Sequence, residues 1–537
     1  MSTIDAIIVA VSIGIVVVVG LLAARKQDKS AKGYFLASGR MPWWIIGSAF
    51  VSTSVSSEQI VGTVGMAYQH GMGIANAEWF SLPAYTLVIL LFIPIYFRTQ
   101  VTTVPDLLQR RFGPLCADVY SWVMMVAYVF VFMVPVLYGG TLAFKELTGW
   151  PFQAVLWATV VLVGLYTVKG GLASVMWTDA AQCLMLVGGG VLLFFFALNE
   201  LPGGIAEGWS AMVDANPQRF HLYLPPDDPY APFLGLLLAT VGLGLFYQAT
   251  NQVMIQRVLG ARSRWDGMMG IIFAGFINFL RPLVTCFLGF IVYHWVHELN
   301  HHEPFGAKEI DKVFPFALQQ FGPSGLRGII LAGFLAAVMS TISALANSTA
   351  TILSLDVYKK VLRPDADDRE VVKAGKMASI FALFIAGAAA PAVQYMGGIF
   401  QYFQTGVAFL SVPFISVILL GILWPRANYQ GGLFGTVGGV AIAGSAMGIH
   451  LYLVNVEGKS IYWVYSAFVA QVIIVIGIIL VSLRYPPPDR EKIAPFIWRP
   501  SILREIQVSE GRPWYQRVTL WFGIYAAIWF TIYITWW

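Results

Sequence analysis

Long apolar runs recur along the whole chain and are separated by short polar segments. A transmembrane helix needs about 20 mostly apolar residues, because it must cross about 30 Å of hydrocarbon and satisfy its own backbone groups there. The pattern predicts an all-α polytopic membrane protein with about 14 spans. They lie near residues 6–24, 43–68, 75–97, 117–144, 152–168, 174–199, 232–256, 266–296, 326–356, 374–396, 398–424, 430–454, 461–483 and 516–537.

Composition agrees with a chain that lives in a bilayer. Of the 537 residues, 58% are apolar and 11% are charged, and the mean hydropathy is +0.71. The core of a soluble protein of this length does not require such an apolar composition. The first run, 6–24, lacks both a preceding basic stretch and a following small-residue cleavage site, so we expect a retained helix rather than a secretion signal.

Lysine and arginine positions predict the orientation, because short cytoplasmic loops are enriched in them. An even number of spans puts both termini on one side. With both outside, about 26 of the 33 basic residues fall in inner loops, Arg257 among them, about 6 fall outside, and Arg281 alone lies within a span. We expect a multi-pass protein of a plasma or bacterial inner membrane with N- and C-termini outside. The enrichment of Lys and Arg in separate short inner loops accounts for the net charge of +5, so no nucleic-acid partner is expected.

Cysteine and histidine add little chemistry. The three cysteines are widely separated and form no CxxC pattern, so neither a disulfide framework nor redox chemistry is expected. Four histidines, at residues 294, 297, 301 and 302, cluster at the outer end of the eighth span. No carboxylate or thiolate completes a clear ligand set, which favours an interfacial, solvated cluster over a metal site.

Polar residues interrupt the second apolar run. Residues 52–59 read Ser-Thr-Ser-Val-Ser-Ser-Glu-Gln, and glycines follow at positions 62 and 65. We expect a helix broken at membrane depth, where exposed carbonyl oxygens can replace the water around a sodium ion. The alternative is that the Ser and Thr side chains pack helices together.

Two later spans carry related interruptions. Residues 340–343 place hydroxyls in an Ala-rich run that can approach a neighbouring helix closely. The seventh span crowds two glycines, a tyrosine and three amide side chains into residues 242–252. It follows the first break by five helices, and paired interruptions of this kind indicate two inverted five-helix repeats around a midplane binding site.

Several blocks of sequence, taken in order, match the pattern of a transporter family. They lie at residues 56–59, 104–112, 170–179, 251–257 and 347–358, and the third reads Gly-Gly-Leu-Ala-Ser-Val-Met-Trp-Thr-Asp. On these blocks the chain resembles the sodium/solute symporter (SSS) family, and within it the sodium/sugar cotransporters, from about residue 34 to residue 424.

The resemblance implies the leucine-transporter-type fold, with two inverted repeats of five helices. The predicted divisions are an N-terminal helix and basic inner loop at 1–42, the first repeat at 43–200, an outer loop at 201–230, the second repeat at 231–424 and three extra helices at 425–537. The oligomeric state and the role of the last three helices stay open.

A sodium site is also implied by the resemblance. Its ligands would be the backbone oxygens of Ser52, Val55 and Ala337 and the hydroxyls of Ser340 and Thr341. Sodium would then be the coupling ion and the only cofactor expected.

A second sodium site of the family would use Asp179, Ser340 and Ser343, but Ala344 stands where a further hydroxyl belongs. One or two ions per cycle therefore stays open. Asp179 could instead pair with a cation on the inner side or cap a helix.

Solute-binding positions follow from the resemblance as well. The matching residues are Gln59, Glu78, Ser81 and Gln404, with Tyr247 as an aromatic inner gate. A polyol bound at low dielectric needs a partner for each hydroxyl, which such side chains supply. Glu78 could instead be a charge at a helix N-terminus, and Gln404 could join helices.

The chain also departs from the sugar-carrier pattern, since Gly244 and Asn278 stand where that pattern has asparagine and lysine. One turn after Asn278, Arg281 offers a bidentate donor, which motivates the hypothesis of an acidic solute such as a uronate or another carboxylate. Alternatively, Arg281 pairs with a carboxylate or reaches toward the inner interface.

Together these observations predict a sodium-coupled symporter that imports a small polar solute, a sugar or sugar derivative, by alternating access. We expect no catalytic residue. Two rival classes are a carrier driven by protons or by no ion, and a membrane sensor that does not transport. A sensor usually carries an added signalling domain, whereas the longest inner segment, 484–517, is short and rich in Pro and Arg.

Overall fold

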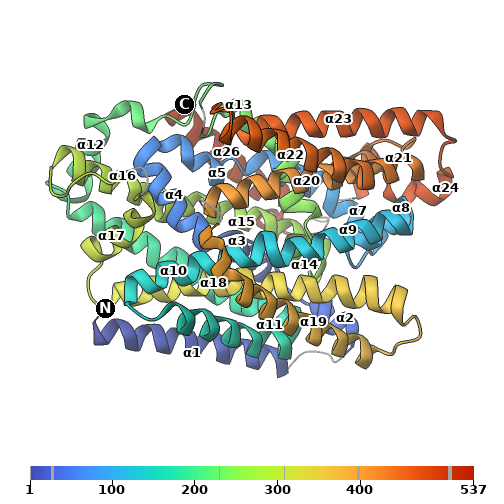
Figure 1. The fold of residues 1–537 in the computed structure, drawn as a ribbon, viewed down its shortest axis with the longest axis horizontal. Coiled ribbons are helices and arrows are strands. Elements are labelled where there is room, and N and C mark those ends of the chain that lie inside the picture. The colour runs from blue at the N-terminus through green and yellow to red at the C-terminus, as the bar shows by residue number, and fades with distance from the viewer. Residues whose placement is uncertain (1, 26–29, 229, 307–308, 396–398, 506–510) are drawn as a thin grey trace.

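The computed structural model of the chain describes residues 2–25, 30–228, 230–306, 309–395, 399–505 and 511–537. Apart from one isolated bridge between Met41 and Ala261, these residues form helices and their connections. Twelve helices in the described ranges are long and apolar enough to cross a membrane, and Figure 1 shows many of the long helices running along the long axis of the molecule. The protein is a multi-pass, all-α membrane protein.

Helices of the first half are α1 (Thr3–Arg25), α2 (Ala31–Leu36), α3 (Trp43–Ser54), α4 (Ser57–His70), α5 (Asn76–Trp79), α6 (Leu82–Leu87), α7 (Ile93–Thr99), α8 (Val104–Arg111), α9 (Pro114–Ala127), α10 (Val134–Thr148), α11 (Phe152–Asn199) and α12 (Gly204–Ala215). The next group is α13 (Phe233–Ala239), η6 (Thr240–Gly244), η7 (Phe246–Thr250), α14 (Gln252–Leu259), α15 (Arg264–Thr285), α16 (Phe287–Tyr293), α17 (Val313–Phe321), α18 (Leu326–Thr351), α19 (Asp368–Ala389) and α20 (Ile399–Leu423). The last group is α21 (Tyr429–Leu433), α22 (Gly439–Asn455), α23 (Trp463–Arg484), α24 (Arg490–Ile493), α25 (Pro500–Glu505) and α26 (Val518–Trp536).

Two regions account for the difference between twelve long helices and about fourteen expected spans. The span expected at 43–68 is divided into α3 and α4, neither of which is long enough alone to cross. The spans expected at 152–168 and 174–199 are joined in α11, which has 48 residues and a non-helical Gly171 at φ 49° and ψ −150°. Because 48 straight residues would extend for about 72 Å, far beyond the hydrocarbon, both halves can cross only if the chain bends at Gly171.

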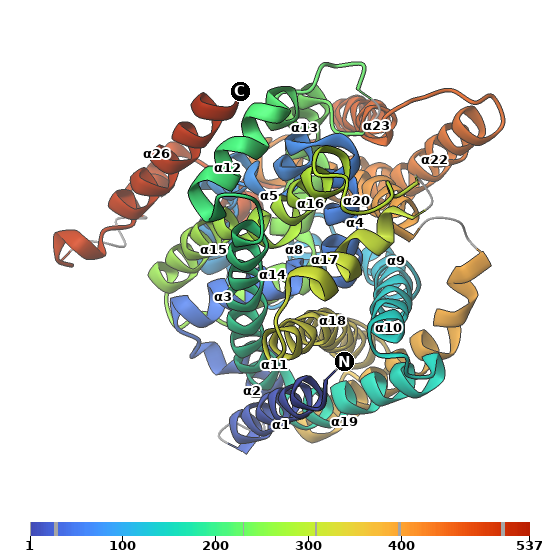
Figure 2. The same cartoon turned by 90° about the vertical axis from the view of Figure 1, so that its left-hand side faces the viewer.

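Burial separates central helices from lipid-facing ones. In the helical run Leu326–Leu362, which contains α18, 94% of the residues in the most apolar 18-residue stretch are buried inside the protein. The corresponding values are 17% for α1 and 11% for α26. Figure 2 views the helices end-on and places α18 between α11 and α10, with α26 at the margin. The Ser, Thr and Asn side chains of α18 are therefore buried inside the protein and shielded from lipid.

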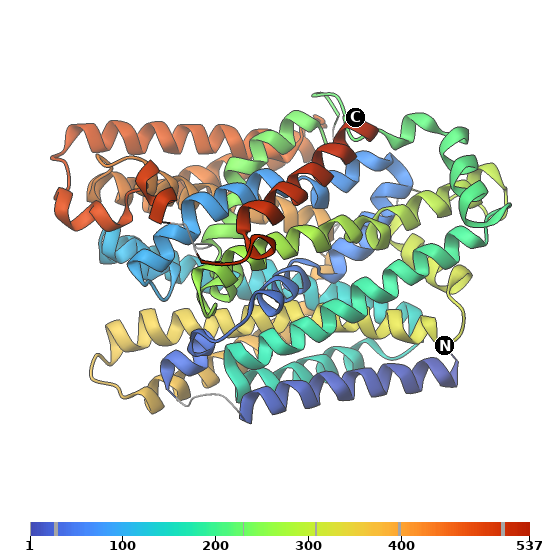
Figure 3. The same ribbon diagram turned by 180° about the vertical axis from the view of Figure 1, so that it is seen from behind.

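Both marked ends of the chain lie toward the same end of the molecule, as Figures 1 and 3 show from opposite sides. This agrees with an even number of crossings. Helices α8 and α24 lie at the opposite end in Figure 1, and each carries two basic residues.

Candidate sodium and solute sites

The helix break expected in the second span is present between α3 and α4. Helix α3 ends at Ser54, and Val55 (φ −106°, ψ 109°) and Ser56 (φ −116°, ψ 171°) are extended before α4 begins at Ser57. The last carbonyl groups of a helix have no donor within that helix. The break therefore leaves backbone oxygens of α3 available to partners from outside it.

Helix α18 supplies hydroxyl groups to this break. The Thr341 hydroxyl lies 3.2 Å from the Ala337 carbonyl oxygen and 3.4 Å from that of Thr53, so it joins α18 to the end of α3. The five residues expected to bind sodium are all buried: Ser52, Val55, Ala337, Ser340 and Thr341. A cluster of carbonyl and hydroxyl oxygens suits a hard cation such as sodium.

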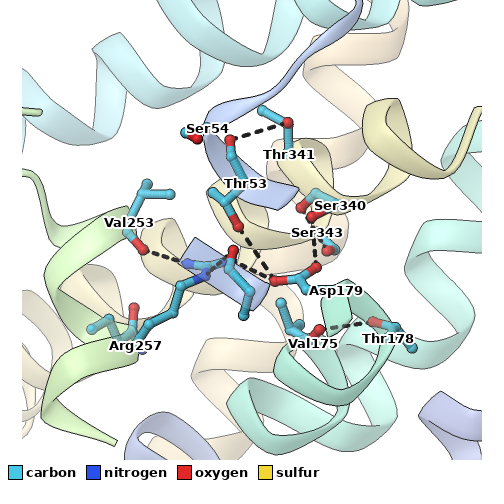
Figure 4. A network of polar contacts seen from close by, with 12 residues as sticks. Thr53, Ser54, Val175, Thr178, Asp179, Val253, Arg257, Ser340, Thr341 and Ser343 are labelled. Carbon is cyan, nitrogen blue, oxygen red and sulfur yellow. Dashed lines mark hydrogen bonds and ion pairs between the residues drawn. The ribbon is translucent and has the colours of Figure 1, made fainter. Parts of the chain in front are cut away.

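Asp179 lies beside this cluster and is fully buried. Its Oδ1 accepts a hydrogen bond from Ser340 Oγ at 2.7 Å, and its Oδ2 accepts from Thr53 Oγ1 at 3.3 Å and from Arg257 Nη2 at 2.8 Å (Figure 4). Ser343 Oγ donates instead to the Ser340 carbonyl at 2.9 Å. The residues expected for a second sodium site thus share Ser340 with the first, and Asp179 has a cationic partner.

The position of Arg257 in this cluster differs from the one predicted from the distribution of Lys and Arg. It was expected in an inner loop, but it lies in α14 with 1% of its surface exposed. Its guanidinium also donates to the Val253 carbonyl and, from Nε, to the Ala49 carbonyl at 3.2 Å. A buried charge requires a partner, and the block 251–257 was already among those that resemble the symporter family.

A second break lies in the seventh span, as expected. The chain passes through η6 and η7, is extended at Asn251 (φ −82°, ψ 121°), and continues in α14. Three buried tyrosine hydroxyls donate hydrogen bonds to this region. The pairs are Tyr96 with the Ala249 carbonyl, Tyr120 with the Thr250 carbonyl and Tyr128 with Asn251 Oδ1, each at 2.7 Å. Tyr96 and Tyr120 satisfy backbone oxygens at the interruption, which backbone at membrane depth requires. Tyr128 holds the Asn251 side chain, whose Oδ1 also accepts from Val253 N and caps α14.

Four of the seven residues expected at the solute site lie together, with Arg281 of α15 in contact with Gln59, Glu78 and Asn278. Its Nη2 donates to Gln59 Oε1 at 3.2 Å and to Glu78 Oε1 at 3.4 Å. Its Nη1 donates to Asn278 Oδ1 at 3.1 Å and to Ser54 Oγ at 3.4 Å. Helices α3, α4, α5 and α15 therefore contribute to one polar cluster beside the first break.

Glu78 balances the charge of this cluster. It is 3% exposed, forms an ion pair with Arg281, and accepts hydrogen bonds from Thr285 Oγ1 at 2.9 and 3.0 Å. Arg281 therefore pairs with a carboxylate of the protein, which the sequence indicated as one alternative to binding an acidic solute. Its Nε is nevertheless buried without a hydrogen-bond partner.

Three expected solute-site residues lie apart from these hydrogen bonds. Ser81 Oγ contacts the Tyr525 hydroxyl of α26 at 2.9 Å. Tyr247 lines a small cavity together with Thr341 and Phe403. Gln404, next to Phe403 on α20, is half-buried.

Three of the four histidines at the outer end of the eighth span, His297, His301 and His302, contact aromatic rings. His297 Nε2 lies 3.0 Å from the Tyr68 hydroxyl, and the His302 ring stacks on Phe305. Within the described residues, no group of three or more His, Cys, Asp or Glu side chains could hold a metal ion.

Comparison with known proteins identifies the family. The model of the sodium:solute symporter family matches residues 34–439. The chain belongs to the sodium:solute symporter family. It is 33% identical over 465 residues to the sodium/glucose cotransporter of Vibrio parahaemolyticus, an alignment that covers 82% of this chain and 85% of that protein. It is 28% identical over 529 residues to sodium/glucose cotransporter 1 of Oryctolagus cuniculus, covering 90% of this chain and 80% of that protein.

A solved structure supports the fold of this symporter. The substrate-bound, outward-open state of a sodium-coupled sialic acid symporter matches with a TM-score of 0.78 and 21% identity, covering 91% of this chain and 99% of that one. At this identity the match supports the fold alone, and the fold is the leucine-transporter type that the sequence predicts. Because the family and the relatives are transporters, the protein is a sodium-coupled symporter and not an enzyme.

Proposed function

We propose that this symporter imports a neutral, polyhydroxylated solute, a sugar or sugar derivative, together with sodium. The ion pair between Glu78 and Arg281 carries the proposal, because the two buried charges cancel and leave a site without net charge. Carboxylate and amide oxygens would accept hydrogen bonds from solute hydroxyls, and guanidinium and amide groups would donate to them. The relatives named for glucose transport favour the same solute class.

An acidic solute is the second candidate. Arg281 Nε is buried without a hydrogen-bond partner, so the guanidinium keeps one donor that a solute carboxylate could engage. Binding an anion beside Glu78 would also require that carboxylate to move or to be protonated, which disfavours this candidate.

We also propose that the coupling ion binds where the break at Val55 meets α18, with Ser340 and Thr341 as side-chain ligands. Support comes from the burial of both residues and from the Thr341 hydroxyl bridging α18 and α3. One ion per cycle is favoured, because the guanidinium of Arg257 already neutralises Asp179.

For the orientation, we propose that both termini face the outside. The basic helices α8 and α24 lie at the end of the molecule opposite the termini, and cytoplasmic ends are enriched in Lys and Arg.

Uptake by sealed proteoliposomes under a fixed inward sodium gradient tests the solute class. The panel contains D-glucose, D-galactose, myo-inositol, D-glucuronate, lactate and an amino acid. Accumulation of one or more neutral polyols, without competition from glucuronate, is the expected result. Selective accumulation of glucuronate or lactate would establish the second candidate, and accumulation of the amino acid alone would overturn both.

A further inference from the structure

The C-terminal helix α26 contacts the segment that carries Glu78. Most of α26 faces outward, with only 11% of its most apolar window buried. Three side chains spaced four residues apart, Tyr525, Trp529 and Tyr533, face inward instead. Residues at this spacing lie on one face of a helix, so α26 has a single inward polar stripe.

Each member of the stripe hydrogen-bonds to a residue near Glu78. The Tyr525 hydroxyl lies 2.9 Å from Ser81 Oγ, Trp529 Nε1 donates to the Trp79 carbonyl at 2.8 Å, and the Tyr533 hydroxyl donates to Asn76 Oδ1 at 2.6 Å. These bonds connect α26 to residues on both sides of Glu78, and the bond from Trp529 goes to Trp79, the residue that follows Glu78. Helix α5 (Asn76–Trp79) lies within the longer helical run Met72–Thr99, and these bonds tie it to a helix outside that run.

The stripe also contacts α15, which carries Asn278 and Arg281. Tyr525 is fully buried, and its ring packs 5.2 Å from that of Phe279. An added Cβ at Gly275 would lie 2.6 Å from the Tyr525 ring, so this glycine allows α26 to pack closely on α15. Trp79 Nε1 in turn donates to the Phe279 carbonyl at 3.3 Å.

We infer that α26 is a positioning element of the solute site: Tyr525, Trp529 and Tyr533 hold the 76–81 segment against α15 so that Glu78 meets Arg281. The inference rests on the proposed role of Glu78 in binding the solute. It assigns a function to a helix outside the two repeats and explains why Ser81 contacts α26 rather than the Arg281 cluster.

A double variant, Tyr525→Phe with Tyr533→Phe, removes two hydroxyls and keeps both rings, so packing and folding are preserved. The matched control is Thr531→Val with Thr535→Val, which removes two hydroxyls from the exposed face of the same helix, where each bonds only within α26. Uptake of D-glucose and myo-inositol is measured for both variants and for the wild-type protein.

For the tyrosine variant, we expect the KM for solute to rise about threefold to tenfold, the size expected for losing two buried hydrogen bonds. Maximal rate per molecule and half-saturating sodium should stay within about twofold of the wild type. Loss of maximal rate without a change in KM, or an equal effect in the threonine control, would overturn the inference.

Hydrogen–deuterium exchange separates this inference from the solute assignment, because it requires no solute. Peptides covering residues 72–82 should exchange faster in the tyrosine variant than in the control, and peptides from α18 should not change. Unchanged exchange at 72–82 would refute the positioning role even if sugars are transported. Faster exchange would sustain it even if the wild type carries none of the tested solutes.

Discussion

Two buried arginine–carboxylate pairs lie close to the helix break, and they differ in how completely they are satisfied. In the pair between Asp179 and Arg257, each of the three guanidinium nitrogens donates a hydrogen bond, and the ion pair distance is 2.8 Å. In the pair between Glu78 and Arg281, the distance is 3.4 Å and Arg281 Nε has no hydrogen-bond partner.

The difference indicates two roles. The Asp179 pair joins α3, α11, α14 and α18 through hydrogen bonds from Thr53, Arg257 and Ser340, which suits a structural connection next to the proposed sodium site. The Glu78 pair is longer and retains an unused donor, which suits a site where a solute exchanges hydrogen bonds with the protein.

The largest expected effect is on stability. Arg257→Gln would leave Asp179 buried without a counter-charge, and we expect a loss of about 3–5 kcal/mol. Thermal unfolding in detergent measures this. Lys459→Gln, which removes an exposed ion pair with Glu457, is the control and should leave the unfolding temperature nearly unchanged. Equal unfolding temperatures for Arg257→Gln and the wild type would contradict a structural role for the Asp179 pair.

The next largest effect is expected on solute affinity and on selectivity between neutral and acidic solutes. Glu78→Gln removes a charged acceptor and leaves the charge of Arg281 uncompensated. We expect the KM for a neutral sugar to rise about tenfold or more, and D-glucuronate to begin to compete for uptake. In the double variant Glu78→Gln with Arg281→Gln, this competition should disappear. If glucuronate fails to compete in Glu78→Gln, the charge-balance argument is wrong.

A smaller effect is expected on sodium affinity. Thr341→Ala removes one oxygen from the proposed ion site, and half-saturating sodium should rise about fivefold to tenfold. Thr341→Ser retains the hydroxyl and should behave like the wild type. Sodium titration of initial uptake rates at saturating solute gives both values. The assignment of Thr341 as a ligand fails if the two variants behave alike.

The smallest effect is expected at Ser343, whose hydroxyl donates to the Ser340 carbonyl within α18. Ser343→Ala should change half-saturating sodium by less than about twofold and leave the Hill coefficient at one. A Hill coefficient that falls from two to one in this variant would show instead that a second ion binds beside Asp179.

The helix breaks could be predicted from sequence because their cause is local. Clustered hydroxyls, amides and glycines in an apolar run are costly in lipid unless they serve a site, and such clusters marked both Val55 and Asn251. The contact between Arg281 and Glu78 remained one of two alternatives, because it joins residues about 200 positions apart in the chain.

Other features required the three-dimensional structure. Arg257 lies only six residues after the second break, so a count of loop charges cannot separate it from the inner loop that follows. The stripe on α26 consists of two tyrosines and a tryptophan, which are also typical of a helix at a membrane interface. Only the packing of these three side chains on α5 and α15 distinguishes a helix that positions a site from a helix at a membrane interface.

Sodium coupling is the central claim, and one measurement tests it most directly. Wild-type proteoliposomes are given a neutral sugar at equal concentration on both sides, with an inward gradient of sodium, potassium, choline or protons at matched ionic strength. We expect the sugar to accumulate above its external concentration only with the sodium gradient. Equal accumulation with a proton gradient, or none with sodium, would contradict the assignment of the coupling ion and of its site at Ser340 and Thr341.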